Sequence, residues 1–72
     1  MTTKIGDFLR KLRLDKQQIL KDMAEILNVS SAFLSAVENG KKSMPDSWYP
    51  ILKQNYALTD EDMDNLRQAA ME

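Results

Sequence analysis

The sequence contains no cysteine and no histidine, and only two glycines and two prolines. Without cysteine and histidine the chain cannot form a disulfide, a thiol nucleophile, a zinc-finger ligand set or an imidazole acid–base group. It also lacks an apolar run near the roughly 20 residues that a membrane-spanning helix needs. Its first residues alternate charged with apolar side chains, unlike a signal peptide. We therefore expect a cytoplasmic protein with no membrane partner, no metal and no cofactor.

The charge of the chain is unevenly distributed. At 72 residues there is room for one domain, near the lower limit at which a single apolar core suffices. The net charge of -1 alone argues against a nucleic-acid binder. However, residues 1–42 hold eight Lys or Arg against five Asp or Glu, whereas residues 43–72 hold two against six. A positive front and a solvated negative back would suit a polyanionic partner such as DNA.

Two short helices joined by a tight turn are predicted at the centre of the chain. The apolar residues of segment 23–27 lie three and four positions apart and so share one helix face. Asn28 tolerates the left-handed backbone that a sharp turn needs, and Ser30 is a good N-cap for the next helix. Gly40 suits the left-handed end of that second helix. This pattern predicts a helix-turn-helix over about residues 19–39.

Three further helices are expected around this pair, which gives an all-α domain of five helices. The first spans about residues 3–14, and the last two span about residues 46–56 and 60–71. Thr2 or Thr3 can cap the first. Apolar residues at helical spacing form the stripes that face the core. They are Ile5, Phe8, Leu9 and Leu12 in the first helix, Trp48, Ile51, Leu52 and Tyr56 in the fourth, and Met63, Leu66, Ala70 and Met71 in the fifth.

The central pair and its flanks resemble the phage repressor/Cro-type helix-turn-helix family, also called the XRE family, over about residues 8–58. The resemblance rests on Leu12, Arg13, the segments 23–25, 27–30 and 37–41, Leu34, Ser35 and Pro45. It implies a lambda-repressor-like DNA-binding domain whose helix at 30–39 is the recognition helix and lies in the major groove of double-stranded DNA. It also implies a structural ion pair between Arg13 and Glu38, so Arg13 is not expected to contact DNA.

The same resemblance assigns the residues that would touch DNA. Base contacts would come from Ser31, Ala32, Ser35, Ala36 and Asn39, and phosphate contacts from Lys21, Ser30, Lys41, Lys42 and Ser43. Three features depart from the family pattern. Ile19 and Leu20 stand where a Ser or Thr cap and a Gln phosphate clamp are usual, and Asn28 replaces the usual turn glycine. The recognition face is small and neutral, so dimerisation or DNA-shape readout would have to supplement weak base reading.

The leading interpretation is a prophage or bacterial repressor that binds DNA as a homodimer. Apolar residues of the last two helices are candidates for the dimer surface, although each could equally complete a monomeric core. They are Trp48, Tyr49, Tyr56, Met63 and Met71. The alternative is a protein-interaction module on the same scaffold, such as an antitoxin-like partner of another protein, which the neutral face and an exposed Phe33 would suit. Binding to a protein partner would not weaken steeply with salt, as DNA binding does.

An enzyme is not expected. The chain has no glycine-rich loop and no carboxylate pair in an apolar setting, and it is too short to enclose a useful pocket. The carboxylates that follow Thr59 could suggest a cation site, but they lack the glycine and the ligand alternation of a calcium loop. We interpret Thr59 as the N-cap of the last helix and its acidic first turn as a complement to the helix dipole.

Overall fold

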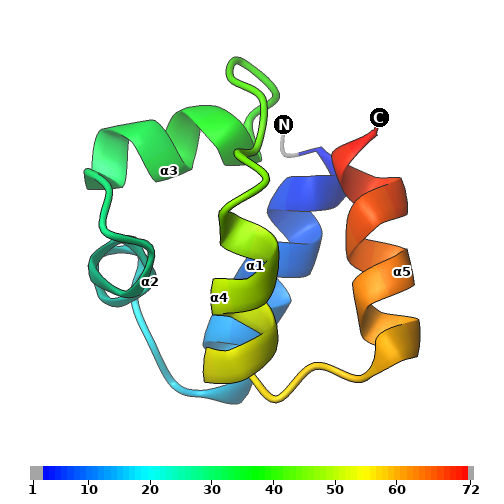
Figure 1. Ribbon diagram of the computed structural model, residues 1–72. Coiled ribbons are helices and arrows are strands. Elements are labelled where there is room, and N and C mark those ends of the chain that lie inside the picture. Colours follow the sequence, from blue (N-terminus) through cyan, green and yellow to red (C-terminus); the bar gives the residue numbers. More distant parts are fainter. Residues whose placement is uncertain (1–2, 72) are drawn as a thin grey trace.

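The computed structural model describes residues 3–71, which form five α-helices and no β-strand (Figure 1). The helices are α1 (Lys4–Asp15), α2 (Leu20–Leu27), α3 (Ser31–Glu38), α4 (Trp48–Asn55) and α5 (Asp60–Ala70). The all-α class and the five helices expected from the sequence are confirmed. Thr2 lies outside the described residues, and Thr3 is the N-cap of α1. None of the helices in this part of the chain is long and apolar enough to cross a membrane.

The helices pack so that α3 lies across one end of the molecule. α1 packs against α3 and α5, and α2 packs against α3 and α4. The two ends of the described chain lie beside α3, whereas the α1–α2 and α4–α5 connections lie at the opposite end (Figure 1). The acidic first turn of α5, with Asp60, Glu61 and Asp62, therefore begins far from α3.

A single apolar core joins all five helices. Its buried members are Ile5, Leu9, Met23, Ala24, Leu27, Leu34, Val37, Trp48, Leu52, Tyr56, Leu58, Met63, Leu66 and Ala69. Trp48 is the largest of them and is only 1% exposed. The ring of Phe33 meets it edge-on, with 5.9 Å between ring centroids and 77° between the ring planes. Phe33 is consequently half-buried, and the expectation that it is exposed was wrong.

Most of the residues considered for a dimer surface are buried in the core of the monomer. Trp48, Tyr56 and Met63 are buried in the monomer, because their helices turn these side chains toward the common centre. Tyr49 is half-buried, with the Arg67 guanidinium 5.8 Å from its ring centroid. Met71 is 85% exposed, so its assignment to the apolar stripe of α5 was wrong.

Two helix ends differ from the sequence-based expectation. α4 begins at Trp48 because the preceding residues form a separate turn, in which the N–H of Trp48 donates to Pro45 O at 3.1 Å. In α5 the buried residue of the last turn is Ala69, three positions after Leu66, whereas Ala70 is half-buried. The helix ends at Ala70. These differences are small, and they leave the order of the elements unchanged.

All four connections between helices use the same local device. In each, one residue adopts positive φ at the C-cap or one position beyond it: Gln17 (55°), Asn28 (59°), Gly40 (78°) and Ala57 (51°). The next N–H then reaches back five residues to a helix carbonyl: Gln18 to Arg13 at 2.8 Å, Val29 to Ala24 at 2.9 Å, Lys41 to Ala36 at 2.8 Å and Leu58 to Lys53 at 3.1 Å. This is the Schellman end, which satisfies carbonyls that a helix leaves unpaired.

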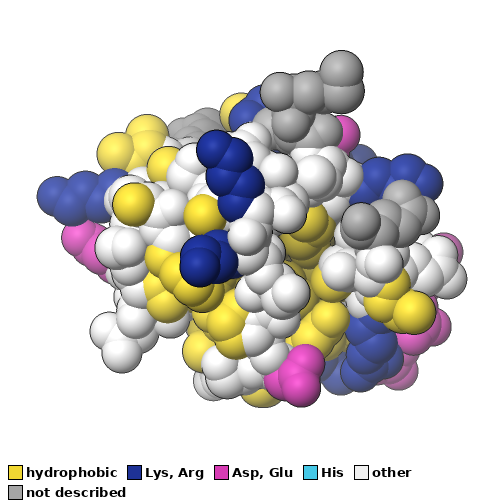
Figure 2. Space-filling view, turned by 90° about the horizontal axis from the view of Figure 1, so that it is seen from above, with side chains coloured by type: hydrophobic (Ala, Val, Ile, Leu, Met, Phe, Trp, Pro, Cys, Tyr) yellow, Lys and Arg dark blue, Asp and Glu magenta, His cyan; other side chains and the backbone are white. Residues whose placement is uncertain are grey.

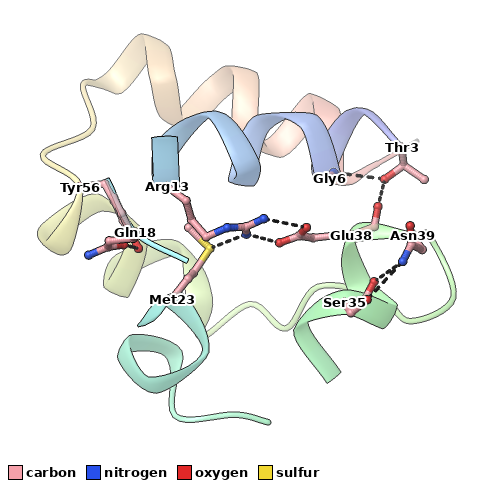
Figure 3. A network of polar contacts seen from close by, with 9 residues as sticks. All are labelled: Thr3, Gly6, Arg13, Gln18, Met23, Ser35, Glu38, Asn39 and Tyr56. Atoms are coloured by element: carbon pink, nitrogen blue, oxygen red, sulfur yellow. Dashed lines mark hydrogen bonds and ion pairs between the residues drawn. The ribbon is translucent and has the colours of Figure 1, made fainter. Parts of the chain in front are cut away.

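Tyr56 fastens the α1–α2 connection to the end of α4. Its hydroxyl donates to Oε1 of Gln18 at 2.6 Å, and the side chain is buried (Figure 3). Burial raises the pKa of the Tyr56 hydroxyl above its usual value near 10, partly offset by the positive charge of Arg13 and reinforced by the negative charge of Asp22. The neutral phenol is therefore the form that stabilises the fold.

This shift predicts an alkaline loss of stability. Since the folded-state pKa of Tyr56 lies above that of the unfolded chain, the folded state keeps a proton that the unfolded chain releases. Stability should fall as pH rises above about 10, by at most about 1.4 kcal/mol per pH unit from this group. Urea titrations between pH 9 and 11 should show a shallower decline for Tyr56→Phe than for the wild type. Tyr49→Phe is the matched control, and an unchanged slope in Tyr56→Phe would contradict the assignment.

Candidate nucleic-acid interface

The C-terminal end of α3 is tied to α1 through a buried ion pair. Arg13 and Glu38 are 6% and 4% exposed. Nη1 of Arg13 pairs with Oε2 of Glu38, and Nη2 donates to Oε1 at 3.2 Å (Figure 3). Nη1 also lies 3.5 Å from the sulfur of Met23 in α2. The guanidinium thus joins three helices from inside, and Arg13 is not placed to contact a ligand at the surface.

The backbone of Glu38 is held by the start of α1. The hydroxyl of Thr3 donates to the carbonyl oxygen of Glu38 at 2.8 Å, and the N–H of Thr3 donates to the same oxygen at 3.3 Å. The Thr3 hydroxyl oxygen also accepts from the N–H of Gly6 at 3.2 Å (Figure 3). A Cβ on Gly6 would lie only 2.4 Å from that Glu38 oxygen. The two helices approach so closely that only glycine fits between them.

Gly6 was missed by the sequence analysis. The signal that could have found it was present, because an isolated glycine inside an otherwise helical pattern often has a packing reason. The sequence pattern could not show which residue packs against Gly6. Glu38 lies 32 positions later in the chain, and its contact with Gly6 depends on how α1 and α3 cross.

The α2–α3 pair, defined as α2, α3 and the connection between them, is compact. Two helices of eight residues each are separated by three residues, of which Asn28 takes the left-handed conformation. The next helix starts at once, because the Ser30 hydroxyl oxygen accepts from the N–H of Phe33 at 3.1 Å. The proton of that hydroxyl is left to donate outward. Ser30 itself is exposed.

The start of α2 lacks a side-chain cap at its N-cap residue. Ile19 occupies this position and is 65% exposed, and a carboxylate oxygen of Asp22 accepts from its N–H at 2.9 Å. The negative charge of Asp22 therefore sits in the first turn of α2. Lys21 is exposed beside it. This end of the α2–α3 pair offers one cation and one anion to an approaching phosphate.

The outward side of α3 carries small polar and apolar groups. Ser31, Ser35 and Ala36 are half-buried, whereas Ala32 and Asn39 are exposed. The side-chain amide of Asn39 donates two hydrogen bonds to Ser35 in the preceding turn. The five residues expected to contact bases therefore share one helix and its C-cap.

Positive charge follows directly after α3. Lys41, Lys42 and Ser43 are exposed in the segment that leaves Gly40. Figure 2 looks down on this end of the molecule, where basic side chains stand near the middle of the face among apolar and uncharged surface. Acidic side chains lie toward the rim of this view. Ser30 and Lys41–Lys42 thus flank α3 at its two ends.

The chain was also compared with known proteins. No family model, curated protein or solved structure matches it. The α2–α3 pair and its surroundings are therefore the observations that bear on its function. Within residues 3–71 there is also no group of three or more acidic side chains placed to hold a metal ion.

Proposed function

We propose that this protein is a sequence-specific DNA-binding transcriptional regulator that places α3 in the major groove and acts as a homodimer, as a prophage or bacterial repressor does. The observation that carries the proposal is the form of the α2–α3 pair. Two eight-residue helices joined by three residues have the dimensions expected of a helix-turn-helix, Arg13 and Glu38 fasten them from behind, and the outward side of α3 carries small uncharged side chains. A helix held this firmly can present its outer face to another molecule without rearrangement.

The size of α3 supports insertion into a major groove. Eight residues of α-helix are about 12 Å long, and the major groove is about 12 Å wide. Ser30 at one end and Lys41 and Lys42 at the other would then lie near the phosphates on opposite edges of the groove. The N–H groups at the start of α3 add a further favourable interaction with phosphate.

Dimerisation would supply the affinity that one domain lacks. A protein with three to five phosphate contacts binds weakly at physiological salt, and the small α3 side chains add little. The molecule measures 28 × 25 × 21 Å, and successive major grooves on one face of DNA are about 34 Å apart. The centres of two copies in contact would lie about one molecular extent apart, 21–28 Å plus the surface side chains, which approaches that distance. We therefore expect a two-fold symmetric operator with half-sites one turn apart.

The proposal is tested by selecting from a pool of random double-stranded DNA with the purified wild-type protein. Enrichment of a two-fold symmetric sequence, with affinity that falls steeply as salt rises, is the expected result. Failure to enrich any sequence, together with negligible binding at low salt, would refute it.

The basic segment after α3 gives a quantitative prediction. Lys41→Ala and Lys42→Ala should each reduce the slope of log K against log salt by about 1.8 for the dimer, because each removes one phosphate contact from both protomers. Affinity should fall to a similar degree for selected and unselected sequences. Lys53→Ala is the matched control, since Lys53 is exposed on α4 and pairs with Asp60 at 3.2 Å. An unchanged slope in the double variant would place the DNA elsewhere.

A protein partner is the second candidate function. The observation in its favour is the exposure of Leu14 (69%) and Ile19 (65%), which flank the α1–α2 connection. Two large apolar side chains exposed five positions apart in the sequence are more typical of protein contacts than of phosphate contacts. An antitoxin-like interaction through this surface would survive high salt, so the salt titration described above also separates the two functions.

A further inference from the structure

The side-chain amide of Asn39 is held in one orientation by Ser35. Its Nδ2 donates to the carbonyl oxygen of Ser35 at 2.9 Å and to the hydroxyl oxygen at 3.3 Å (Figure 3). A carbonyl oxygen can only accept, so Nδ2 and not Oδ1 must face Ser35. Among residues 3–71 no donor is paired with Oδ1, and Asn39 is exposed. The amide therefore turns its acceptor outward.

This orientation limits what Asn39 can recognise. Asparagine reads adenine through two bonds only when Nδ2 donates to N7 while Oδ1 accepts from the N6 amino group. Here one N–H of Nδ2 is engaged by Ser35 and the other remains available, whereas Oδ1 is the outward acceptor. A phosphate group carries no donor at neutral pH, so Oδ1 cannot bind the DNA backbone directly. The groups left in the major groove are the amino groups of adenine and cytosine.

Resting on the DNA-binding function proposed above, we infer that Asn39 determines specificity by accepting one hydrogen bond from the exocyclic amino group of adenine or cytosine, with Ser35 as its positioning residue. The Ser35 hydroxyl oxygen accepts a hydrogen bond from the Asn39 amide, so the hydroxyl proton of Ser35 remains available to donate. The acceptor Oδ1 of Asn39 and the donor hydroxyl of Ser35 then lie one helical turn apart at the end of α3. Adenine N6 and cytosine N4 both lie beside an acceptor on the same base-pair edge, so the two side chains fit such an edge together.

The first test compares sites selected by the wild type and by Asn39→Ala. One position restricted to adenine or cytosine in the wild-type site should lose its restriction in the variant. Affinity for the wild-type site should fall about five- to tenfold for each half-site, the effect of one hydrogen bond. Circular dichroism should show that Asn39→Ala remains folded, because Asn39 is exposed and follows the last residue of α3. Lys53→Ala, at an exposed position of α4, should leave this position restricted.

The second test changes single atoms of the selected base. Removing the exocyclic amino group in one half-site, by placing purine for adenine or 2-pyrimidinone for cytosine, should weaken the wild type five- to tenfold and leave Asn39→Ala unaffected. Ser35→Ala removes the hydroxyl but keeps the carbonyl, so it should weaken the preference for the amino group without abolishing it.

Two results would overturn the inference alone. They are unchanged affinity of the wild type when the amino group is removed, which means that Oδ1 accepts nothing from it, and an equal loss on all sequences in Asn39→Ala, which means a backbone contact. If the wild type enriches no sequence at all, the proposed function fails and this inference fails with it. The two failures are therefore distinguishable.

Discussion

Glu38→Ala should lower the free energy of unfolding by about 3–5 kcal/mol, because it leaves the Arg13 guanidinium buried without a counter-ion. A domain of this size has a total stability of about 4–11 kcal/mol. The variant would therefore be close to unfolded, although only one carboxylate is lost. Urea denaturation followed by circular dichroism measures the change. Glu25→Ala, which removes an exposed glutamate of α2, should change stability by less than about 0.5 kcal/mol.

A double variant separates the cost of the broken pair from the value of the intact one. Replacing both partners with apolar side chains, Arg13→Met with Glu38→Leu, should restore most of the stability lost in Glu38→Ala. Met23, which already contacts Arg13, offers an apolar neighbour for the new side chains. If the double variant is as unstable as Glu38→Ala, the ion pair itself contributes the stability and the argument from an unpaired charge is wrong.

Gly6→Ala should destabilise the protein by about 2–3 kcal/mol, the cost of overpacking, even though alanine favours helices over glycine by about 1 kcal/mol. The new Cβ would meet the Glu38 carbonyl oxygen at 2.4 Å. That oxygen belongs to the backbone and is held by Thr3, so it cannot move aside alone. α1 and α3 would have to separate, and the contacts of Thr3 and Arg13 with Glu38 would stretch together.

Helix propensity and packing predict opposite signs for the change in stability of Gly6→Ala, so its direction decides between them. Thermal unfolding of Gly6→Ala should show a lower melting temperature, by roughly 4–8 °C for each kcal/mol in a domain of this size. Arg10→Ala, at an exposed position of the same helix, should change stability little, because alanine and arginine differ little in helix propensity. A stabilised Gly6→Ala would show that propensity outweighs packing here and that α3 tolerates displacement.

Local patterns in the sequence were sufficient for much of the fold. Helical spacing located all five helices, and the left-handed residues Asn28 and Gly40 were expected because asparagine and glycine are the residue types that tolerate that conformation. Thr59 likewise caps α5 as expected, accepting from Asp62 N at 3.1 Å. Arg13 and Glu38 were paired through the family resemblance, since nothing local in the chain joins positions 25 apart.

Features that depend on tertiary packing were not accessible. Gln17 and Ala57 adopt positive φ although their side chains do not favour it, because the helices on either side must turn there. Trp48 and Tyr56 are buried as the helical spacing predicted, but the edge-on contact of Phe33 with Trp48 depends on how the helices pack. At the candidate interface, the residue types were readable from the sequence, but the orientation of the Asn39 amide follows from the approach of Ser35.

The helix connections also have a consequence for evolution and engineering. A side chain in the left-handed conformation costs about 1–2 kcal/mol, and two exposed connections bear it, at Gln17 and Ala57. Glycine at either position would remove that cost. The gain exceeds the roughly 0.5–1 kcal/mol that glycine costs through the entropy of the unfolded chain. Neither residue lies in α3 or its flanks. Heat tolerance can therefore change at these two connections without altering the surface of α3, because the two lie at separate places on one small scaffold.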